Sequence, residues 1–507
     1  MIGMATRMKI SIEITNDNGD CVRSTRTDEI PSFEDFETKG FRDSFDKIEN
    51  AVLESRKEVS DSIVEAYLSG VSKKKVQLLT ETTPGKAEES PFPYGIESEM
   101  GTLEVQTHRI VDDLGKITYN VNTECFAEVH PKEKHRSSRF NELMYEFSSE
   151  LSYRDCGRYL NRIRQQSDGI KVTTLRNTVE RDGIKLQNHI QNTLGQVLIS
   201  NGFSETGVKG EEVPVPKIKM KSHDEAEVLA VAQELGITHQ IAVSDYENPA
   251  MSIDIAIDDV GVKRQSDNRP NPDIEESSKK RKYAYQTVVH ISNQSGSFVL
   301  NAANQMSATV LTLGFLLHNC LLWGHQLLFY VDGETSLFTT IKKVFGFLPI
   351  KFILDWYHVD KKLKERLSMG MNGYKLRNAF LEKLRPLLWK GDVDGAIALL
   401  KNLPDNHIKN IEHITKLIDY LTRNKNYIPC YAIRAKLGLC NSSNKGEKAN
   451  DLVVSNRQKH NGMSWSREGS LGLASICAIS HNRQLENWAY NHTVDLSLRE
   501  VDSSLAA

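Results

Sequence analysis

Two segments in the second half of the chain join a run of apolar residues to an aspartate. MSIDIAIDDVGV alternates isoleucines up to Asp258, and in HQLLFYVDGE the run LLFYV leads directly into Asp332. An aspartate behind one strand is often only a cap of the strand end. Two aspartates at the ends of neighbouring strands can hold divalent metal ions, because carboxylate oxygens are hard ligands. Two such ions are what an in-line phosphoryl displacement needs.

The elements around these aspartates follow an order that predicts an α/β core. After residue 236 the sequence predicts three strands, a long apolar helix over 302–322, the strand that ends at Asp332, a short helix and a strand that ends at Asp355. This is the order of the RNase-H-like fold, in which the first and fourth strands lie side by side. We therefore expect Asp258 and Asp332 to meet at one edge of the sheet.

A third acid is expected on a helix that packs against this sheet after an insertion. Residues 359–428 are helical and basic, so they predict an all-α insertion that interrupts the α/β pattern. Beyond it, SSNKGE predicts a helix that begins near Lys445 with Glu447 in its first turn. Glu447 is the preferred third acid, and Glu468 in SWSREGS is the alternative.

The middle of the chain carries a pattern typical of DNA binding. Two amphipathic segments, at 152–165 and 173–181, flank a Ser-Asp-Gly turn, which is the outline of a helix-turn-helix. Helix pairs of this kind also occur in proteins that bind no DNA. The basic residues available there for phosphates are Arg158, Arg162, Arg164, Lys171, Arg176 and Arg181. A further basic run consists of Lys279, Lys280, Arg281 and Lys282, which either tracks phosphates or is a solvated loop.

Length and pattern together predict a multidomain α+β chain. The 507 residues exceed the size of one domain. The predicted regions are a helical region and linker at 1–93, a β ribbon with the helix-turn-helix at 94–220, the first part of the catalytic core at 221–358, the helical insertion at 359–430 and the rest of the core at 431–507.

Composition excludes several classes of protein. The seven cysteines include no CxxC pair, which argues against a disulfide framework and a zinc ribbon and favours the cytoplasm. We find no apolar run suited to a membrane span, no secretory signal, no GxGxxG and no Walker-type loop. Residues 1–100 carry 13 Lys and Arg against 20 Asp and Glu, whereas residues 341–391 carry 12 against 4. The asymmetry predicts either a surface in the second half that faces a polyanion or a basic helix face exposed to solvent.

Together these motifs resemble bacterial insertion-sequence transposases of the DDE class, in particular the ISKra-type group, which is related to Mutator-like transposases. The similarity covers roughly residues 150–495. It is carried by IDDVGV, the VDG strand end, DWYH with its basic helix, IPCYAIRAKLGL, SSNKGE and GMSWSREGS. The most specific element is Asp355 followed by His358. The sequence departs from the family in having Asp259 after Asp258, a loose match before Glu447 and no cysteine-rich ribbon.

The resemblance implies a DNA transferase that cleaves the ends of an insertion sequence and joins them to target DNA. Asp258 (or Asp259), Asp332 and Glu447 would bind Mg²⁺, with Mn²⁺ as the substitute ion. Asp355, Trp356 and His358 would lie near the active site, although Trp356 and His358 are equally well explained as packing residues. The implied location is the nucleoid in the cytoplasm. The protein would act as a homo-oligomer, and the acidic helical region 33–75 is the candidate interface. The alternatives are an inactive or domesticated DNA-binding protein and a structure-selective nuclease of the same fold.

Overall fold

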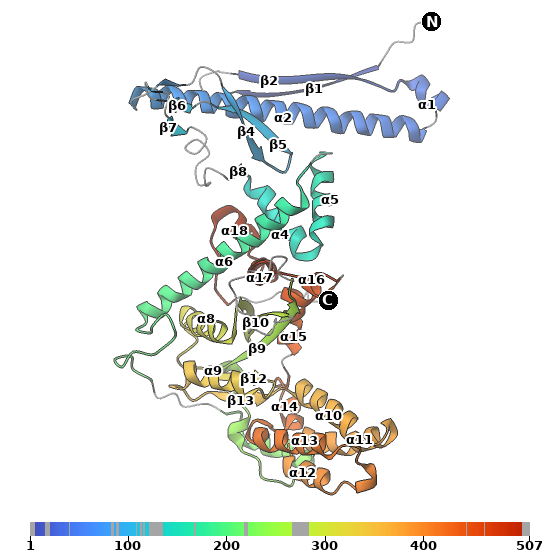
Figure 1. Cartoon of the computed structure of the whole chain (residues 1–507), viewed down its shortest axis with the longest axis vertical. Coiled ribbons are helices and arrows are strands. Elements are labelled where there is room, and N and C mark those ends of the chain that lie inside the picture. Colours follow the sequence, from blue (N-terminus) through green and yellow to red (C-terminus); the bar gives the residue numbers. More distant parts are fainter. Residues whose placement is uncertain are drawn as a thin grey trace, which may run out of the picture. The chain divides into compact units, whose positions relative to one another are not determined.

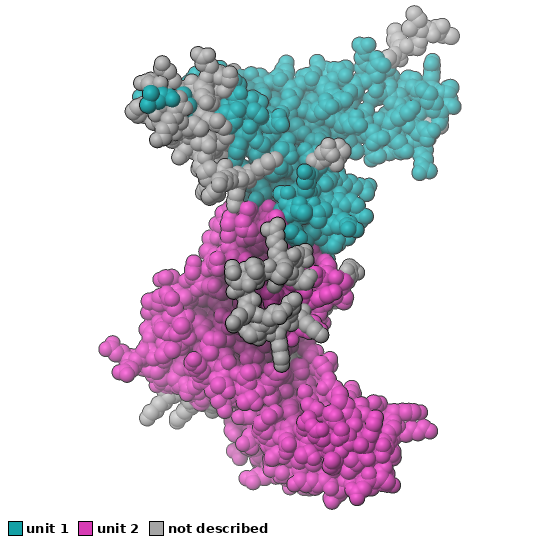
Figure 2. Space-filling view, viewed as in Figure 1, with its two compact units in different colours: residues 1–176 teal, residues 177–507 magenta. Residues whose placement is uncertain are grey.

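The computed structural model of the chain describes residues 6–15, 21–39, 41–82, 86–87, 91–107, 109–111, 114, 117–120, 135–166, 169–216, 222–265, 283–442, 444–460 and 462–498. The chain divides into two compact units, residues 1–176 and 177–507 (Figure 2). This division is coarser than the five predicted regions, whose boundaries stay predictions. Among the described helices, none has the length and apolar character that crossing a membrane requires.

The first unit opens with a β-hairpin that the sequence analysis did not predict. Strands β1 (Thr6–Thr15) and β2 (Cys21–Ile30) pair antiparallel, and helices α1 (Phe33–Lys39) and α2 (Phe41–Thr82) follow. The two helices confirm the helical pattern predicted over 33–75. Short strands come next: β3 (Lys86–Ala87), β4 (Phe92–Glu97), β5 (Thr102–Thr107), β6 (Arg109–Val111), β7 (Ile117–Asn120) and β8 (His135–Arg136). They form two three-stranded sheets and confirm a β structure in this region.

Helices α4 (Ser138–Glu150), α5 (Tyr153–Ile163) and α6 (Val172–Ser200) occupy the predicted helix-turn-helix region. Ser137 and Ser152 cap α4 and α5, because each side chain accepts a hydrogen bond from the backbone N–H three residues later. The second helix of the predicted pair is much longer than 173–181. It extends to Ser200, since buried leucines, with Val179 and Ile190 between them, continue through the whole of α6.

The second unit is built on a five-stranded sheet with the order β11-β10-β9-β12-β13 (Figure 1). The strands are β9 (Ser252–Lys263), β10 (Tyr283–Asn293), β11 (Gly296–Ala302), β12 (Gln326–Val331) and β13 (Lys351–Leu354). The first three pair antiparallel, whereas β12 runs parallel to both β9 and β13. Helices α8 (Gln305–His318) and α9 (Thr335–Phe345) connect the later strands. Three strands, a helix, a strand, a helix and a strand is the predicted order.

The segment after β13 is helical, as predicted. It contains α10 (Trp356–Gly370), α11 (Tyr374–Trp389), α12 (Val393–Lys401) and α13 (Ile411–Asn424). Their buried residues, among them Leu363, Leu384 and Leu417, share one core with Tyr330 and Leu354 of the sheet. The insertion is therefore fixed to the sheet at the strand ends that carry the predicted acids.

The chain then returns to the sheet. Helices α14 (Tyr431–Lys436) and α15 (Asn444–Asn450) precede a π-helical turn (Asp451–Ser455) and the short helix α16 (Asn456–Gln458). Helices α17 (Arg467–His481) and α18 (Leu485–Asn491) complete the described part. Helix α15 packs on β9 and β10, and α17 packs on β10 and β11. Helix α7 (Glu225–Glu234), which precedes the sheet in sequence, packs against α14.

Candidate functional site

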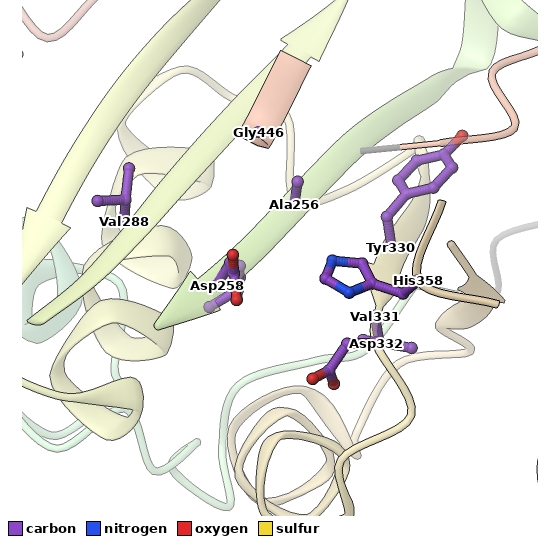
Figure 3. Close-up of a pocket in the computed structure, with 9 residues that line it drawn as sticks. Ala256, Asp258, Val288, Tyr330, Val331, Asp332, His358 and Gly446 are labelled. Atoms are coloured by element: carbon purple, nitrogen blue, oxygen red, sulfur yellow. The ribbon is translucent and has the colours of Figure 1, made fainter. Parts of the chain in front are cut away.

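The strand register brings the two predicted aspartates together. Strands β9 and β12 are adjacent and parallel, with Ala256 opposite Tyr330. Asp258 and Asp332 each come two residues after this pair, so they lie side by side at the carboxyl ends of the paired segments. Both line a small pocket, with His358 and Gly446. Figure 3 shows Asp258, Asp332 and His358 around this pocket, with the His358 ring directed toward Asp258.

Asp258 is held by two donors. Its Oδ1 accepts the backbone N–H of Asp259 at 2.8 Å, and its Oδ2 accepts Nδ2 of Asn450 at 2.6 Å. Burial raises the pKa of Asp258 above its ordinary value; the nearby His358 ring lowers it and the charge of Asp332 raises it. The repulsion between the two carboxylates is what a bound cation would remove.

Asp259 belongs to a different environment. Its Oδ1 accepts the hydroxyl of Thr287 at 2.5 Å and its Oδ2 accepts Nε2 of Gln305 at 2.9 Å. Asp259 does not line the pocket that contains Asp258. Successive residues of a strand point to opposite faces, which separates the two aspartates. Asp258 is therefore the better placed of the two.

Asp332 sits in a tight turn that admits only glycine at the next position. Its Oδ1 accepts the backbone N–H of Glu334 at 2.8 Å, and its carbonyl oxygen accepts the hydroxyl of Tyr420 at 3.0 Å. Gly333 has φ +89°, and a Cβ there would come within 2.8 Å of the Tyr420 ring. A left-handed φ and this close contact explain the glycine in the VDG motif.

Glu334 adds a carboxylate that the sequence analysis did not single out. The charge of Asp332 is the main cause that raises the pKa of Glu334, followed by burial and by the charges of Asp259 and Asp258. Glu334 thus lies in the field of the aspartates. Its position two residues after Asp332, in the same turn, is the signal that could have identified it.

The preferred third acid, Glu447, lies on α15 beside the pocket. Its Oε1 is 3.6 Å from Nε2 of His358. Burial is the main cause that raises the pKa of Glu447; His358 lowers it, and Asp355 and Asp258 raise it. The alternative, Glu468, is exposed in the first turn of α17 and lines neither of the two pockets near Asp332.

The geometry stops short of an assembled three-ligand metal site. Within the described part of the chain, no group of three or more His, Cys, Asp and Glu side chains is arranged to hold a metal ion. The structure brings together Asp258 and Asp332 in one pocket, and Glu447 lies 3.6 Å from His358 of that pocket.

Three residues of the DWYH motif have different environments. Asp355 is fully buried and caps α10, where it accepts the N–H of Tyr357 at 2.7 Å and the hydroxyl of Ser442 at 2.9 Å. Trp356 packs against Trp389 and Tyr431, with ring centroids 4.8 and 5.1 Å apart. The packing explanation therefore accounts for Trp356, whereas His358 lines the pocket.

A larger cleft of about 700 Å³ opens from Asp332 toward the insertion. Its lining includes Asp332, Glu334 and His358. The basic residues of its lining are Lys361, Lys362, Arg366, Lys416 and Arg423, from α10 and α13. Glu365 and Asp419 offset part of this charge. The cleft thus brings carboxylates and cations together in one lining, an arrangement suited to a phosphodiester and a divalent ion together.

The basic residues that were predicted to bind DNA differ in their exposure to solvent. The exposed residues are Arg158, Arg162, Lys171 and Arg176. Arg181 is partly buried and donates to Asp182. Arg164 is wrongly included, because it is 1% exposed, donates to Glu97 and Thr102, and lies 4.7 Å over the Phe140 ring. Its guanidinium ties α5 to the β4–β5 hairpin. The basic run Lys279–Lys282 lies outside the described residues.

Comparison with known proteins adds little to this geometry. No protein-family model and no curated protein matches the sequence. A solved structure, the Drosophila P element transposase strand transfer complex, is similar over 74% of this chain and 85% of that chain, at 12% sequence identity and a TM-score of 0.22. A similarity at that level carries no structural argument, so the function has to be argued from the chain's own residues.

Proposed function

We propose that this chain is a metal-dependent DNA transferase of the transposase class, which cleaves DNA at the ends of a mobile element and joins them to target DNA. The observation that carries the proposal is the pairing of Asp258 with Asp332 on adjacent parallel strands, in one pocket that shares Asp332 with a cleft lined by lysines and arginines. Phosphoryl transfer needs carboxylates that hold metal ions and cations that hold the phosphates of the strand.

The donor set fits Mg²⁺, with Mn²⁺ as the substitute. Asp258 and Asp332 offer hard oxygens from one pocket, and their mutual repulsion favours a bound cation. Glu447, whose Oε1 lies 3.6 Å from Nε2 of His358, is the proposed third ligand. When bound, the metal would activate the attacking oxygen and stabilise the leaving one.

The chain's own residues would position the DNA. Lys361 and Lys362 on α10, with Arg423 on α13, line the cleft next to Asp332 and would hold the phosphates of the reacting strand. His358 lines both the pocket of Asp258 and the cleft of these lysines, so its ring would contact the reacting strand between the two. The exposed cations of α5 and the start of α6 would contribute to recognition of the DNA ends.

Two further features support the proposal. The strand order β11-β10-β9-β12-β13 is the order that an RNase-H-like core requires. The helical insertion α10–α13 separates Asp332 from Glu447 and supplies one wall of the cleft. A nuclease that only cuts DNA has little need of such an insertion, which favours the transferase.

The test is a strand-transfer assay with DNA from the element's own flanks as donor and supercoiled plasmid as target. Wild type should give joined products only with Mg²⁺ or Mn²⁺, and Asp332→Asn should give none. Asp405→Asn, an exposed aspartate of the insertion, is the matched control and should behave as wild type. Cleavage without joining would identify a nuclease instead. DNA binding without any cleavage would identify an inactive relative.

A further inference from the structure

Asn450 is a buried amide that touches the first catalytic aspartate. It is the last residue of α15 and is 6% exposed. Its Nδ2 donates to Oδ2 of Asp258 at 2.6 Å, whereas its Oδ1 has no hydrogen-bond partner among the described residues. The described residues therefore supply a partner for the Nδ2 of Asn450 but none for its Oδ1.

An unpaired buried acceptor has to be accounted for. Leaving an amide oxygen buried without a partner is unfavourable, unless something absent from the protein satisfies it. An amide oxygen is also one of the ligand types that divalent cations accept. The side chain with this unpaired oxygen, Asn450, already donates a hydrogen bond to Asp258, a proposed metal ligand.

The amide is also the side chain that orients Asp258. The other donor to Asp258 is the backbone N–H of Asp259, which a change of side chain leaves in place. Gly446 comes one helical turn before Asn450, on the same face of α15, and lines the pocket with Asp258 and Asp332. A π-helical turn follows directly at Asp451–Ser455, a distortion often found at functional sites. Helix α15 thus brings Asn450 to the Asp258 carboxylate, one turn after the Gly446 that lines the pocket.

We infer that Asn450 is a positioning residue of the metal site, whose Nδ2 fixes the Asp258 carboxylate and whose Oδ1 completes the oxygen atoms offered to a divalent cation. The inference rests on the proposed function, because it presumes a cation at Asp258 and Asp332. Residues that support metal ligands in this way are typically worth 10–100-fold in metal affinity.

The experiment measures Mn²⁺ binding to the full chain by titration calorimetry, without DNA. Asn450→Leu keeps the size of the side chain and removes both the donor and the acceptor, and it should raise the Kd for Mn²⁺ about tenfold or more. Asn450→Ala repeats the test in case the leucine variant does not fold. Asn450→Asp should destabilise the metal-free protein by repelling Asp258, yet bind Mn²⁺ at least as tightly as wild type, because it supplies an oxygen ligand.

Two controls separate this inference from the proposed function. Asn301→Leu alters another buried asparagine, whose Nδ2 donates to Ser475, and should leave the Mn²⁺ affinity unchanged. Asp332→Asn should abolish binding at the site. If wild type and Asp332→Asn bind Mn²⁺ equally, the proposed metal site is wrong. If Asp332→Asn loses binding but folded Asn450→Leu and Asn450→Ala keep the wild-type Kd, the role of Asn450 alone is wrong.

Discussion

At the scale of single residues, the pocket that contains Asp258 and Asp332 adjoins a buried polar network through Tyr330. Arg434, fully buried, donates to both carboxylate oxygens of Glu247 at 2.6 Å. The hydroxyl of Tyr330, which lines the pocket, lies 3.2 Å from Oδ1 of Asp254. Burial, and then the charge of Glu247, raises the pKa of Asp254 to about 6, against an opposing effect of Arg434. The carboxyl of Asp254 therefore keeps its proton up to a higher pH in the folded state than in the unfolded chain.

This raised pKa predicts how stability depends on pH. A carboxyl with a raised pKa in the folded state contributes fully below its unfolded pKa, and the contribution is lost as the pH rises through about 6. Asp254→Asn should therefore match wild type near pH 4 and be more stable above pH 6, by on the order of 2–3 kcal/mol. Urea unfolding at pH 4, 5.5 and 7.5 measures the difference.

The exposed Asp405→Asn is the control for Asp254→Asn and should differ little from wild type at any of these pH values. A stability difference between Asp254→Asn and wild type that stayed constant from pH 4 to 7.5 would contradict a raised pKa for Asp254.

Several residues of the site were predictable and others were not. Asp258 and Asp332 follow from apolar runs in a recognisable order, because that order matches a known fold in which the first and fourth strands are neighbours, as β9 and β12 are here. Asn450 was not predictable, because its contact depends on the rotation of α15 after a long insertion. Arg164 was misassigned for a related reason: its sequence position is that of an exposed helical cation, but the β4–β5 hairpin covers it.

At the scale of elements, helices α6 and α17 cross at a pair of glycines. A Cβ on Gly183 would lie 2.0 Å from the backbone oxygen of Gly472, and a Cβ on Gly472 would lie 2.2 Å from the backbone oxygen of Glu180. Backbone atoms cannot move aside as a flexible side chain can. Since α17 also packs on β10 and β11, this crossing fixes α6 against the helix that covers the sheet.

Gly183→Ala should therefore lower the free energy of unfolding by at least about 2 kcal/mol, the cost of overpacking a close contact. Gly195 lies on the same helix, and a Cβ there would meet no atom within 4 Å. Gly195→Ala should stabilise the helix by about 0.5–1 kcal/mol, because alanine loses less entropy on folding. Chemical denaturation of both variants measures the contrast, and equal effects would show that the helices do not cross as described.

Most of the helices and strands could be predicted from the hydrophobic pattern of the sequence. The buried strands β9 and β12 and the helices of the insertion have the apolar spacing that their environments demand. The β1–β2 hairpin was missed, although Met8, Ile10, Ile12 and Ile14 alternate with polar residues there. None of the four is fully buried, so the alternation was the only signal.

At the scale of the whole molecule, charge is distributed unevenly along the chain. The excess of Lys and Arg over residues 341–391 includes the α10 cations of the cleft next to Asp332. Phosphate contacts release counterions, so binding through this cleft should weaken steeply with salt.

Replacing Lys361 and Lys362 by glutamine should weaken DNA binding and reduce the slope of log K against log salt by about 1.8, which is about 0.9 for each phosphate that a lysine no longer neutralises. Fluorescence anisotropy with one duplex at several salt concentrations measures the slope. The matched control replaces Lys383 and Lys401, exposed lysines of the same insertion that do not line the cleft. An equal change of slope in both double variants would mean that the cleft has no particular part in DNA binding.

The central claim is that Asp332 binds the metal that performs phosphoryl transfer, and changing its ligand atom tests this most directly. Asp332→Cys should lose DNA cleavage in Mg²⁺, which prefers oxygen, and regain part of it in Mn²⁺, which tolerates a thiolate better. Asp332→Ala should stay inactive with both ions. Such a switch of metal preference would establish direct coordination, whereas wild-type cleavage by Asp332→Ala in Mg²⁺ would contradict the claim.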